Sequence, residues 1–489
     1  MKKSIAKNYI YNLIYQMLTI LLPLITTPYL SRVLGAEPIG IYGYTISIVT
    51  YFILFGSLGV AMYGQREIAY LQQDKKARSK AFWEIVIVRA ITLTISIILF
   101  YLIYGRTGDY ALYYKILIVQ LIANIFDISW LFQGIEEFDK IVIRNLVVKM
   151  LSLLLIFTLI KTPNDLWKYF AIYVGAELIG NLTLWFYIPK YLEKIEINEL
   201  RFKRHIKPAL ALFIPQIAIQ IYTVLDKTMI GKLTNDMAEV GYYEQAQKIV
   251  KAALTIISAL QTVMNSRIAN AYATDNKKEI KLCLEKSFDF VWILSIPMMF
   301  GLIAIAPKFV PWYYGEGFDG VTPILIATAP ILIALGLNGI TGVQYLVQIG
   351  KQKIFTISVT IGAIVNVIFN LMLIPFFGGV GAAIASVIAE VAILGIQLRP
   401  FKEQFSILEI LKLSVKCLIS GIVMFIVVKI MVNCMLVSII NTVIQVAVGG
   451  IIYIFMLFIL KYQFLKDLYY QLISGIKSKL RGGNKNASN

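Results

Sequence analysis

The chain has 489 residues, of which 58% are hydrophobic and 15% are charged, and its formal net charge is +18. A soluble protein of this length needs far more polar residues to cover its surface, so this composition excludes a soluble enzyme and predicts an integral membrane protein. The positive charge is explained by membrane topology and by contact with anionic membrane lipids, so no nucleic-acid partner is expected.

Apolar segments follow one another along the chain, and each is long enough to cross a bilayer core of roughly 30 Å. They are apolar on all sides, so they must be helices and not strands of a barrel. The first is followed by many others, so we do not expect a cleaved signal peptide. We predict an all-α integral membrane protein with about fourteen transmembrane helices, over residues 9–31, 41–63, 81–104, 111–133, 143–161, 166–188, 208–230, 241–264, 286–306, 321–341, 354–375, 378–398, 411–431 and 436–460.

Most Lys and Arg residues lie in the two tails and in alternate loops. The positive-inside rule places these segments in the cytoplasm, so both termini of this multi-pass protein are expected there. The loop over residues 189–207 is especially rich in charged side chains, and the tail after residue 460 is basic.

Four short sequence patterns occur twice, in the same order. Their recurrence predicts two related bundles of six helices, as in many secondary transporters. Six spans separate equivalent positions, so the bundles should be parallel repeats. The pairs are residues 31–42 with 226–243, 74–76 with 275–278, and 174–177 with 387–390, the first pair containing two patterns.

These repeats divide the chain into five parts. We predict a first six-helix bundle over residues 1–188, a cytoplasmic linker over 189–207 and a second bundle over 208–398. Two additional transmembrane helices follow over 411–460, and residues 461–489 form a basic cytoplasmic tail.

Ionisable side chains inside a span are energetically costly, and they mark a bundle interior or a watery cavity. Arg89 lies about eight residues into the third span, roughly 12 Å along the helix axis, which is too deep to reach the interface easily. Glu244, Lys248 and Lys251 are spaced i, i+4 and i+7 on the eighth span, so they share one face. A cavity-facing role is favoured for both sets, and structural ion pairs remain the alternative.

Further cations lie at the ends of spans, where they either reach the interface or contact a phosphate. Arg32 and the pair formed by Asp226 and Lys227 occupy equivalent outer ends of the two bundles, and Arg66 lies at the cytoplasmic end of the second span. The candidate substrate-binding residues are Arg32, Arg66, Arg89, Asp226, Lys227, Glu244, Lys248 and Lys251.

Buried acids are candidates for ion coupling, because a desolvated carboxylate can exchange a proton or hold a cation. These acids are Asp127, Glu177 and Glu390, with Asp289 nearer the cytoplasm. A symmetric structural pairing is the alternative for Glu177 and Glu390. We expect no cofactor except a coupling ion, either H⁺ or Na⁺.

Catalytic and metal sites are not expected. His205 is the sole histidine and lies in a basic loop, which makes a histidine-based catalytic centre or proton relay improbable. Cys283, Cys417 and Cys434 are scattered, so they predict neither a disulfide framework nor a metal site.

Residues 28–35, 64–69, 225–231 and 241–244 resemble the oligosaccharide flippases of polysaccharide biosynthesis. These proteins belong to the multidrug/oligosaccharidyl-lipid/polysaccharide exporter superfamily, and the resemblance covers essentially the whole chain. It implies a V-shaped fold of two bundles and alternating access, with an ion gradient as the driving force. It also implies transport of a polyprenyl-pyrophosphate-linked oligosaccharide across the bacterial cytoplasmic membrane for capsule, O-antigen or exopolysaccharide synthesis, with glycosyltransferases and a polymerase of the same pathway as partners.

Three alternatives stay open. The first is a flippase for a peptidoglycan lipid precursor, and the second is a cation drug exporter of the same superfamily, which should have a more acidic lumen. The third is a membrane polysaccharide polymerase or ligase. Such an enzyme needs a large external loop with catalytic residues, whereas the external loops predicted here are short.

Overall fold

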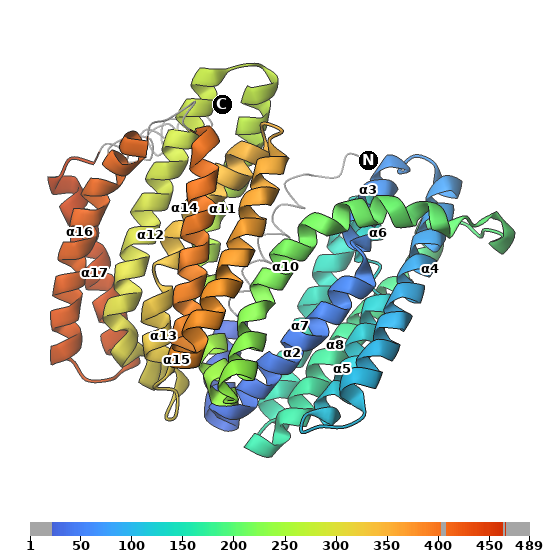
Figure 1. The fold of residues 1–489 in the computed structure, drawn as a ribbon, viewed down its shortest axis with the longest axis horizontal. Coiled ribbons are helices and arrows are strands. Elements are labelled where there is room, and N and C mark those ends of the chain that lie inside the picture. Colours follow the sequence, from blue (N-terminus) through green and yellow to red (C-terminus); the bar gives the residue numbers. More distant parts are fainter. Residues whose placement is uncertain (1–21, 402–406, 463–464, 466–489) are drawn as a thin grey trace, which may run out of the picture. The chain divides into compact units, whose positions relative to one another are not determined.

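The computed structural model describes residues 22–401, 407–462 and 465, which form helices and connecting segments without any β-strand (Figure 1). Ten helical segments in this part of the chain are long and apolar enough to cross a membrane. The predicted all-α membrane fold is therefore confirmed, while the number of fourteen spans stays a prediction. Most of the first predicted span and of the basic tail lies outside the described residues.

The chain forms two compact units, of which the first comprises residues Met1–Lys248, Tyr314–Val321 and 366–382. The second predicted span is divided between two helices, because Leu58 and Gly59 adopt positive φ angles of 46° and 69°. Besides helical residues 22–34, the helices of this unit are α2 (Ala36–Ser57), α3 (Val60–Tyr70), α4 (Lys75–Phe100), α5 (Ala111–Ile125), α6 (Ser129–Gly134), α7 (Phe138–Leu159), α8 (Leu166–Trp185), α9 (Ile188–Tyr191), α10 (Ile206–Thr234) and the beginning of α11 (Met237–Ala273).

A buried aromatic core holds one end of this unit together. Phe82 of α4 and Trp130 of α6 are almost fully buried, and their ring centroids lie 5.4 Å apart. Gly64 of α3 makes this packing possible, since a Cβ there would lie 2.6 Å from the Trp130 ring. Ala209, in the first turn of α10, belongs to the same core. The beginning of α10 is thus packed on α3, α4 and α6.

The two copies of the first repeated motif meet inside this unit. A Cβ on Gly40 of α2 would overlap the carbonyl oxygen of Met237, and one on Gly241 of α11 would overlap that of Ala36. Each glycine therefore lets the other helix approach to backbone contact, as small residues do in membrane helix pairs. The sequence repeat corresponds to a reciprocal helix crossing.

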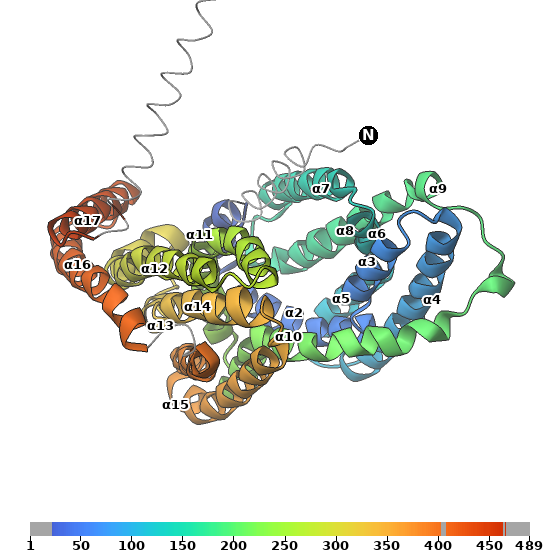
Figure 2. The same cartoon turned by 90° about the horizontal axis from the view of Figure 1, so that it is seen from above.

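The second unit comprises residues 249–313, 322–365 and 383–489. The long helix α15 contributes to both units, because its residues 366–382 belong to the first, and it is broken at Gly378, with φ 54° and ψ −131°, where the eleventh and twelfth predicted spans meet. Helices α16 and α17, predicted as an additional pair, lie side by side (Figures 1 and 2). The helices that lie mostly in this unit are the rest of α11, α12 (Lys277–Tyr314), α13 (Val321–Thr328), α14 (Ile331–Asn338), the π-helix η5 (Gly339–Val347), α15 (Gln352–Phe401), α16 (Ile407–Cys434) and α17 (Ile439–Ile459).

Candidate functional site

Arg89 of α4 is buried in the first unit, with 3% of its surface exposed. Its Nη2 lies 3.4 Å from Oδ2 of Asp127, which follows α5. Asp127 also accepts hydrogen bonds from the backbone N and the hydroxyl of Ser129, at 3.0 and 2.6 Å. Nε and Nη1 of Arg89 have no partner among the described residues. The structure therefore brings one predicted substrate-binding residue and one predicted coupling acid together, and leaves two guanidinium donors for a water or an anion.

A polar network extends from this pair to the neighbouring helices. Nη1 of Arg144 in α7 donates to the Ser129 hydroxyl at 3.5 Å and to Oδ1 of Asn181 at 2.9 Å. Nδ2 of Asn181 in turn donates to the carbonyl oxygen of Ala123 at 2.8 Å. These bonds connect α5, α6, α7 and α8 across the interior of the unit. Arg144 and Asn181 were not identified from the sequence.

Glu177 of α8 lies at a cavity of about 550 Å³. Nδ2 of Asn124 donates to its Oε1 at 3.2 Å. Lys149 of α7 lines the same cavity, so a cation and an acid share it. The lining residues are Leu22, Pro23, Thr26, Val148, Lys149, Ser152, Leu153, Ile156, Tyr169, Ile172, Tyr173, Ala176 and Glu177. A cavity of this size with hydroxyl, carboxylate and ammonium groups suits a small polar ligand or an ion with its water.

Asp226 of α10 is also buried, with 6% exposure. Its Oδ1 accepts from Nδ2 of Asn370 at 2.7 Å, and its Oδ2 accepts from the hydroxyl of Tyr243. The neighbouring Lys227 points elsewhere and places its Nζ 2.9 Å from Oε2 of Glu244. The structure thus joins Lys227 to Glu244, a pair that the sequence analysis did not predict, and places Asp226 in a separate hydrogen-bonded cluster.

The other predicted substrate-binding cations have different surroundings. Arg32 and Arg66 are exposed. Arg32 donates to a backbone carbonyl one turn earlier at 3.0 Å, and the Arg66 guanidinium lies 5.8 Å from the ring centroid of Tyr63. On α11, Lys248 is half-buried and Lys251 is exposed. The structure does not gather all eight predicted residues into one cluster.

Glu390 of α15 lies in the second unit and is 3% exposed. Nδ2 of Asn338 donates to its Oε2 at 2.6 Å, while Oδ1 of Asn338 has no partner within the described residues. A second buried chain runs nearby from Thr341, which donates to Oε1 of Gln397 at 2.7 Å, to Ser358, which accepts from that glutamine at 3.0 Å. Both clusters connect α15 to α14 and η5. A π-helix such as η5 often marks a functional site.

Asp289 of α12, the fourth candidate acid, is half-buried and accepts a 2.6 Å hydrogen bond from the hydroxyl of Tyr462. Burial, together with the nearby Cys417 and Asp289, raises the pKa of the Tyr462 phenol, so it stays a neutral donor. This contact fixes the end of the additional helix pair to α12 and gives Asp289 a structural role.

Two charged sites were missed by the sequence analysis. Lys149 carries the signal of an ionisable residue inside a predicted span, and that signal was sufficient to identify it. His205, in contrast, looked like an ordinary loop residue, but it is 2% exposed and lies 2.7 Å from Glu84. No local signal in the sequence indicates that pair, because 121 residues separate its members.

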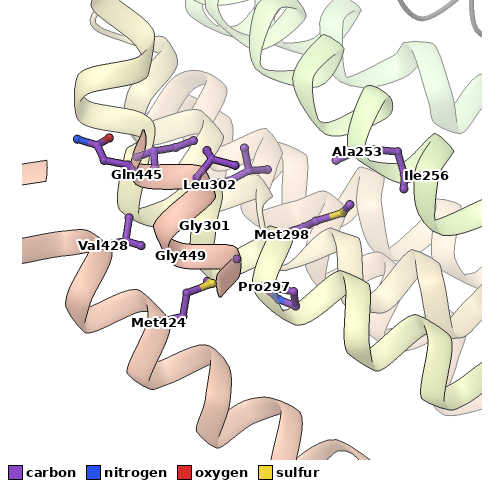
Figure 3. A pocket seen from close by; sticks show the side chains of 13 residues that line it. Ala253, Ile256, Pro297, Met298, Gly301, Leu302, Met424, Val428, Gln445 and Gly449 are labelled. Carbon is purple, nitrogen blue, oxygen red and sulfur yellow. The ribbon is translucent and has the colours of Figure 1, made fainter. Parts of the chain in front are cut away.

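The second unit contains an apolar cavity of about 290 Å³ among α11, α12, α16 and α17 (Figure 3). Pro297 and Gly301 of α12 and Gly449 and Gly450 of α17 contribute little side-chain volume to its wall. The remaining lining side chains are hydrophobic except for Gln445. Such a cavity suits an apolar group.

Comparison with protein families gives two matches. The family of polysaccharide biosynthesis proteins matches residues 5–265, just over half of the chain. The family of the lipid II flippase MurJ matches residues 145–462. A protein of Escherichia coli (strain K12) that is named as an O-antigen transporter is 23% identical over 402 residues, which cover 81% of this chain and 96% of the relative.

Two solved structures are similar to the whole chain or most of it. The lipid II flippase MurJ in an inward closed conformation has a TM-score of 0.74 at 19% identity, covering 95% of this chain and 100% of that one. An inward-facing multidrug resistance MATE transporter of the MOP superfamily has a TM-score of 0.66 at 15% identity. This match covers 83% of this chain and 98% of the MATE chain. These similarities establish the fold. The chain belongs to the polysaccharide biosynthesis protein family, and it is a multi-pass membrane transporter with the fold shared by MurJ and MATE proteins, not an enzyme.

Proposed function

We propose that this protein is a flippase that moves a polyprenyl-pyrophosphate-linked oligosaccharide unit across the bacterial cytoplasmic membrane. The observation that carries this proposal is the match to the O-antigen transporter along almost its entire length. The arrangement favoured by the distribution of Lys and Arg has both termini in the cytoplasm. Anionic lipids, the glycosyltransferases that build the unit and the polymerase that consumes it are the proposed partners.

The buried and half-buried cations are consistent with such a cargo. A pyrophosphate is anionic, and guanidinium groups bind phosphate through a planar set of donors, whereas lysine acts as a point charge. Arg89 retains two unpaired donors, and Lys248 is half-buried on α11. In the proposed cycle, Arg66 and Arg89 meet the pyrophosphate first, and Lys227, Lys248 and Lys251 take it over after the bundles rock.

The crossing of Gly40 and Gly241 supports alternating access. In the proposed orientation it lies at the outer ends of α2 and α11, so its backbone contact closes that end of the pathway. The hydroxyls of Ser47 and Thr228 lie 2.7 Å apart and add a second contact between α2 and α10. Opening toward the outside then requires both contacts to separate.

Coupling to H⁺ or Na⁺ is proposed at Glu177 and Glu390. Glu177 lines a cavity, and Glu390 faces an amide whose oxygen lacks a donor. A protonated Glu390 would supply that donor. Asp127 is the ion-pair partner of Arg89 and is better suited to compensating its charge.

A second candidate function is the flipping of a peptidoglycan lipid precursor, which is favoured by the match to the MurJ family over residues 145–462. Complementation separates the two. The chain is expressed in a bacterium that lacks its O-antigen or capsule flippase, and surface polysaccharide is compared with lipid-linked units. Restored surface polymer supports the first function. Growth rescue only in a strain depleted of its lipid II flippase supports the second.

A further inference from the structure

The segment that connects α8 to α10 is held against α4 by side chains. Its regular structure is limited to α9 and two short 3₁₀ turns, Ile197–Glu199 and Phe202–His205. Arg78 of α4 donates from Nη2 to the carbonyl oxygen of Tyr191 at 2.7 Å. The hydroxyl of Ser79 accepts from the backbone N of Glu193 at 2.8 Å. Figure 1 shows α10 beginning beside the first turns of α4.

Glu84 is the centre of the attachment, and its side chain is fully buried. Its Oε1 accepts from the backbone N of Arg201. Its Oε2 accepts from Nε of Arg204 at 2.8 Å, and it lies 2.7 Å from Nη2 of the same guanidinium and 2.7 Å from Nε2 of His205. One carboxylate of α4 therefore bonds three residues of the last turn before α10.

His205 extends this cluster to α3. Its Nδ1 lies 2.6 Å from the hydroxyl of Tyr63, which is itself buried. A neutral imidazole that donates from Nε2 to Glu84 accepts the Tyr63 proton at Nδ1, so both ring nitrogens and the phenol are satisfied. The helix begins at the next residue, Ile206, and Ala209 is part of the aromatic core beneath it. The start of α10 is thus defined by polar bonds on one side and by apolar packing on the other.

A buried carboxylate with several charged and backbone donors is costly to remove, because each donor then loses its partner in an apolar environment. Arg201, Arg204 and His205 all belong to the connection between the two predicted bundles. This short segment is the covalent link through which movement of the first bundle reaches α10, beside the direct packing of α10 on α2 and α3. Its attachment to α4 therefore contributes to how closely the first turn of α10 follows that movement.

We propose that Glu84 is a positioning residue of the transport cycle, which holds residues 192–205 and the first turn of α10 on α4. This inference rests on the proposed transport function. Glu84 is not proposed to contact the cargo. It acts through Arg204 and His205.

The test compares the full-length protein with Glu84→Gln by hydrogen–deuterium exchange in lipid nanodiscs. Glu37→Gln, which alters an exposed acid in the first turn of α2, is the matched control. Exchange in residues 192–213 should rise several-fold in Glu84→Gln and stay unchanged in the control. Tyr63→Phe deletes one hydrogen bond of the cluster and should give a smaller rise in the same peptides, which keeps the test valid if Glu84→Gln does not fold. Unchanged exchange in both variants would overturn the proposal.

A reversible cross-link tests the functional part. Ser79→Cys and Glu193→Cys introduce two thiols at neighbouring positions, since the Ser79 hydroxyl lies 2.8 Å from the backbone N of Glu193, in a background whose Cys283, Cys417 and Cys434 are replaced by alanine. Flipping of a lipid-linked oligosaccharide is measured in proteoliposomes. Glu84→Gln should lose most of its flipping rate, the oxidised cross-link should restore it, and a reductant should remove it again. Faster exchange with a normal flipping rate would overturn the positioning role, whereas a wild-type protein that flips nothing would count against the transport function alone.

Discussion

The charged side chains buried in this protein find their partners on other helices. Arg89 of α4 has Asp127 beyond α5, and Glu390 of α15 has Asn338 at the end of α14. A charge in an apolar interior is tolerated only when it is paired and hydrogen-bonded. Each pair therefore stabilises the fold and is also a candidate for the transport site, and single substitutions distinguish these two contributions.

Asp127→Asn removes the counter-charge of Arg89 and should destabilise the protein by about 3–5 kcal/mol, since it leaves a buried charge unpaired. Thermal unfolding in detergent is the measurement. Lys76→Gln is the control, because its partner Glu199 is 4.0 Å away and both side chains are exposed, so its pair contributes little. An equal loss of thermal stability in Asp127→Asn and Lys76→Gln would contradict the burial of the ion pair between Arg89 and Asp127.

Glu390→Gln replaces an exchangeable acid with an amide of the same shape. If Glu390 carries the coupling ion, flipping in proteoliposomes should no longer respond to an imposed H⁺ or Na⁺ gradient, while the protein stays folded. Glu177→Gln tests the acid at the 550 Å³ cavity in the same way. A full gradient response in both variants would exclude these two acids as coupling sites.

Helix packing depends on a few positions without side chains. Gly40 and Gly241 allow α2 and α11 to touch through their backbones, and Gly64 allows Trp130 to pack against α3. In the proposed cycle the backbone contact between α2 and α11 must form and separate. The strength of this contact therefore sets the balance between the inward and outward states.

Gly40→Ala or Gly241→Ala should force α2 and α11 apart and favour the outward-open state. The readout is disulfide formation between Ser47→Cys and Thr228→Cys, whose native hydroxyls lie 2.7 Å apart, in the same cysteine-free background. The cross-linking yield should fall several-fold. Gly395→Ala, where a Cβ meets nothing within 4 Å, is the control and should leave the yield unchanged. An undiminished yield in Gly40→Ala would contradict the role of the crossing.

Hydropathy was sufficient to predict the all-helical membrane fold, because a segment in the bilayer must satisfy its backbone hydrogen bonds internally regardless of its neighbours. The repeated motifs also predicted that Gly40 and Gly241 occupy equivalent places. The contacts of Asp226 and Glu84 could not be predicted from the sequence, because they depend on which helices pack together. Asp226 was assigned to the cargo with Lys227, yet it bonds to Asn370, a residue 144 positions away.

The whole molecule is a many-helix membrane transporter whose two units hold separate chemical features. The first unit contains the Arg89 network and the cavity at Glu177, and the second contains the Glu390 cluster and the apolar cavity at Gln445. The proposed cargo has an anionic pyrophosphate, a polar glycan and a long apolar chain. These three kinds of group are chemically compatible with the charged, polar and apolar features of the two units.

Direct flipping by the purified protein tests the central claim. Lipid-linked oligosaccharide is incorporated into proteoliposomes, and the fraction accessible to an external glycosidase is followed over time. Wild-type protein should make nearly all of the lipid accessible, whereas Arg89→Gln and protein-free vesicles should leave about half protected, as expected for two leaflets that do not exchange. Protection that persists with folded wild-type protein, under every imposed H⁺ or Na⁺ gradient, would contradict the flippase account.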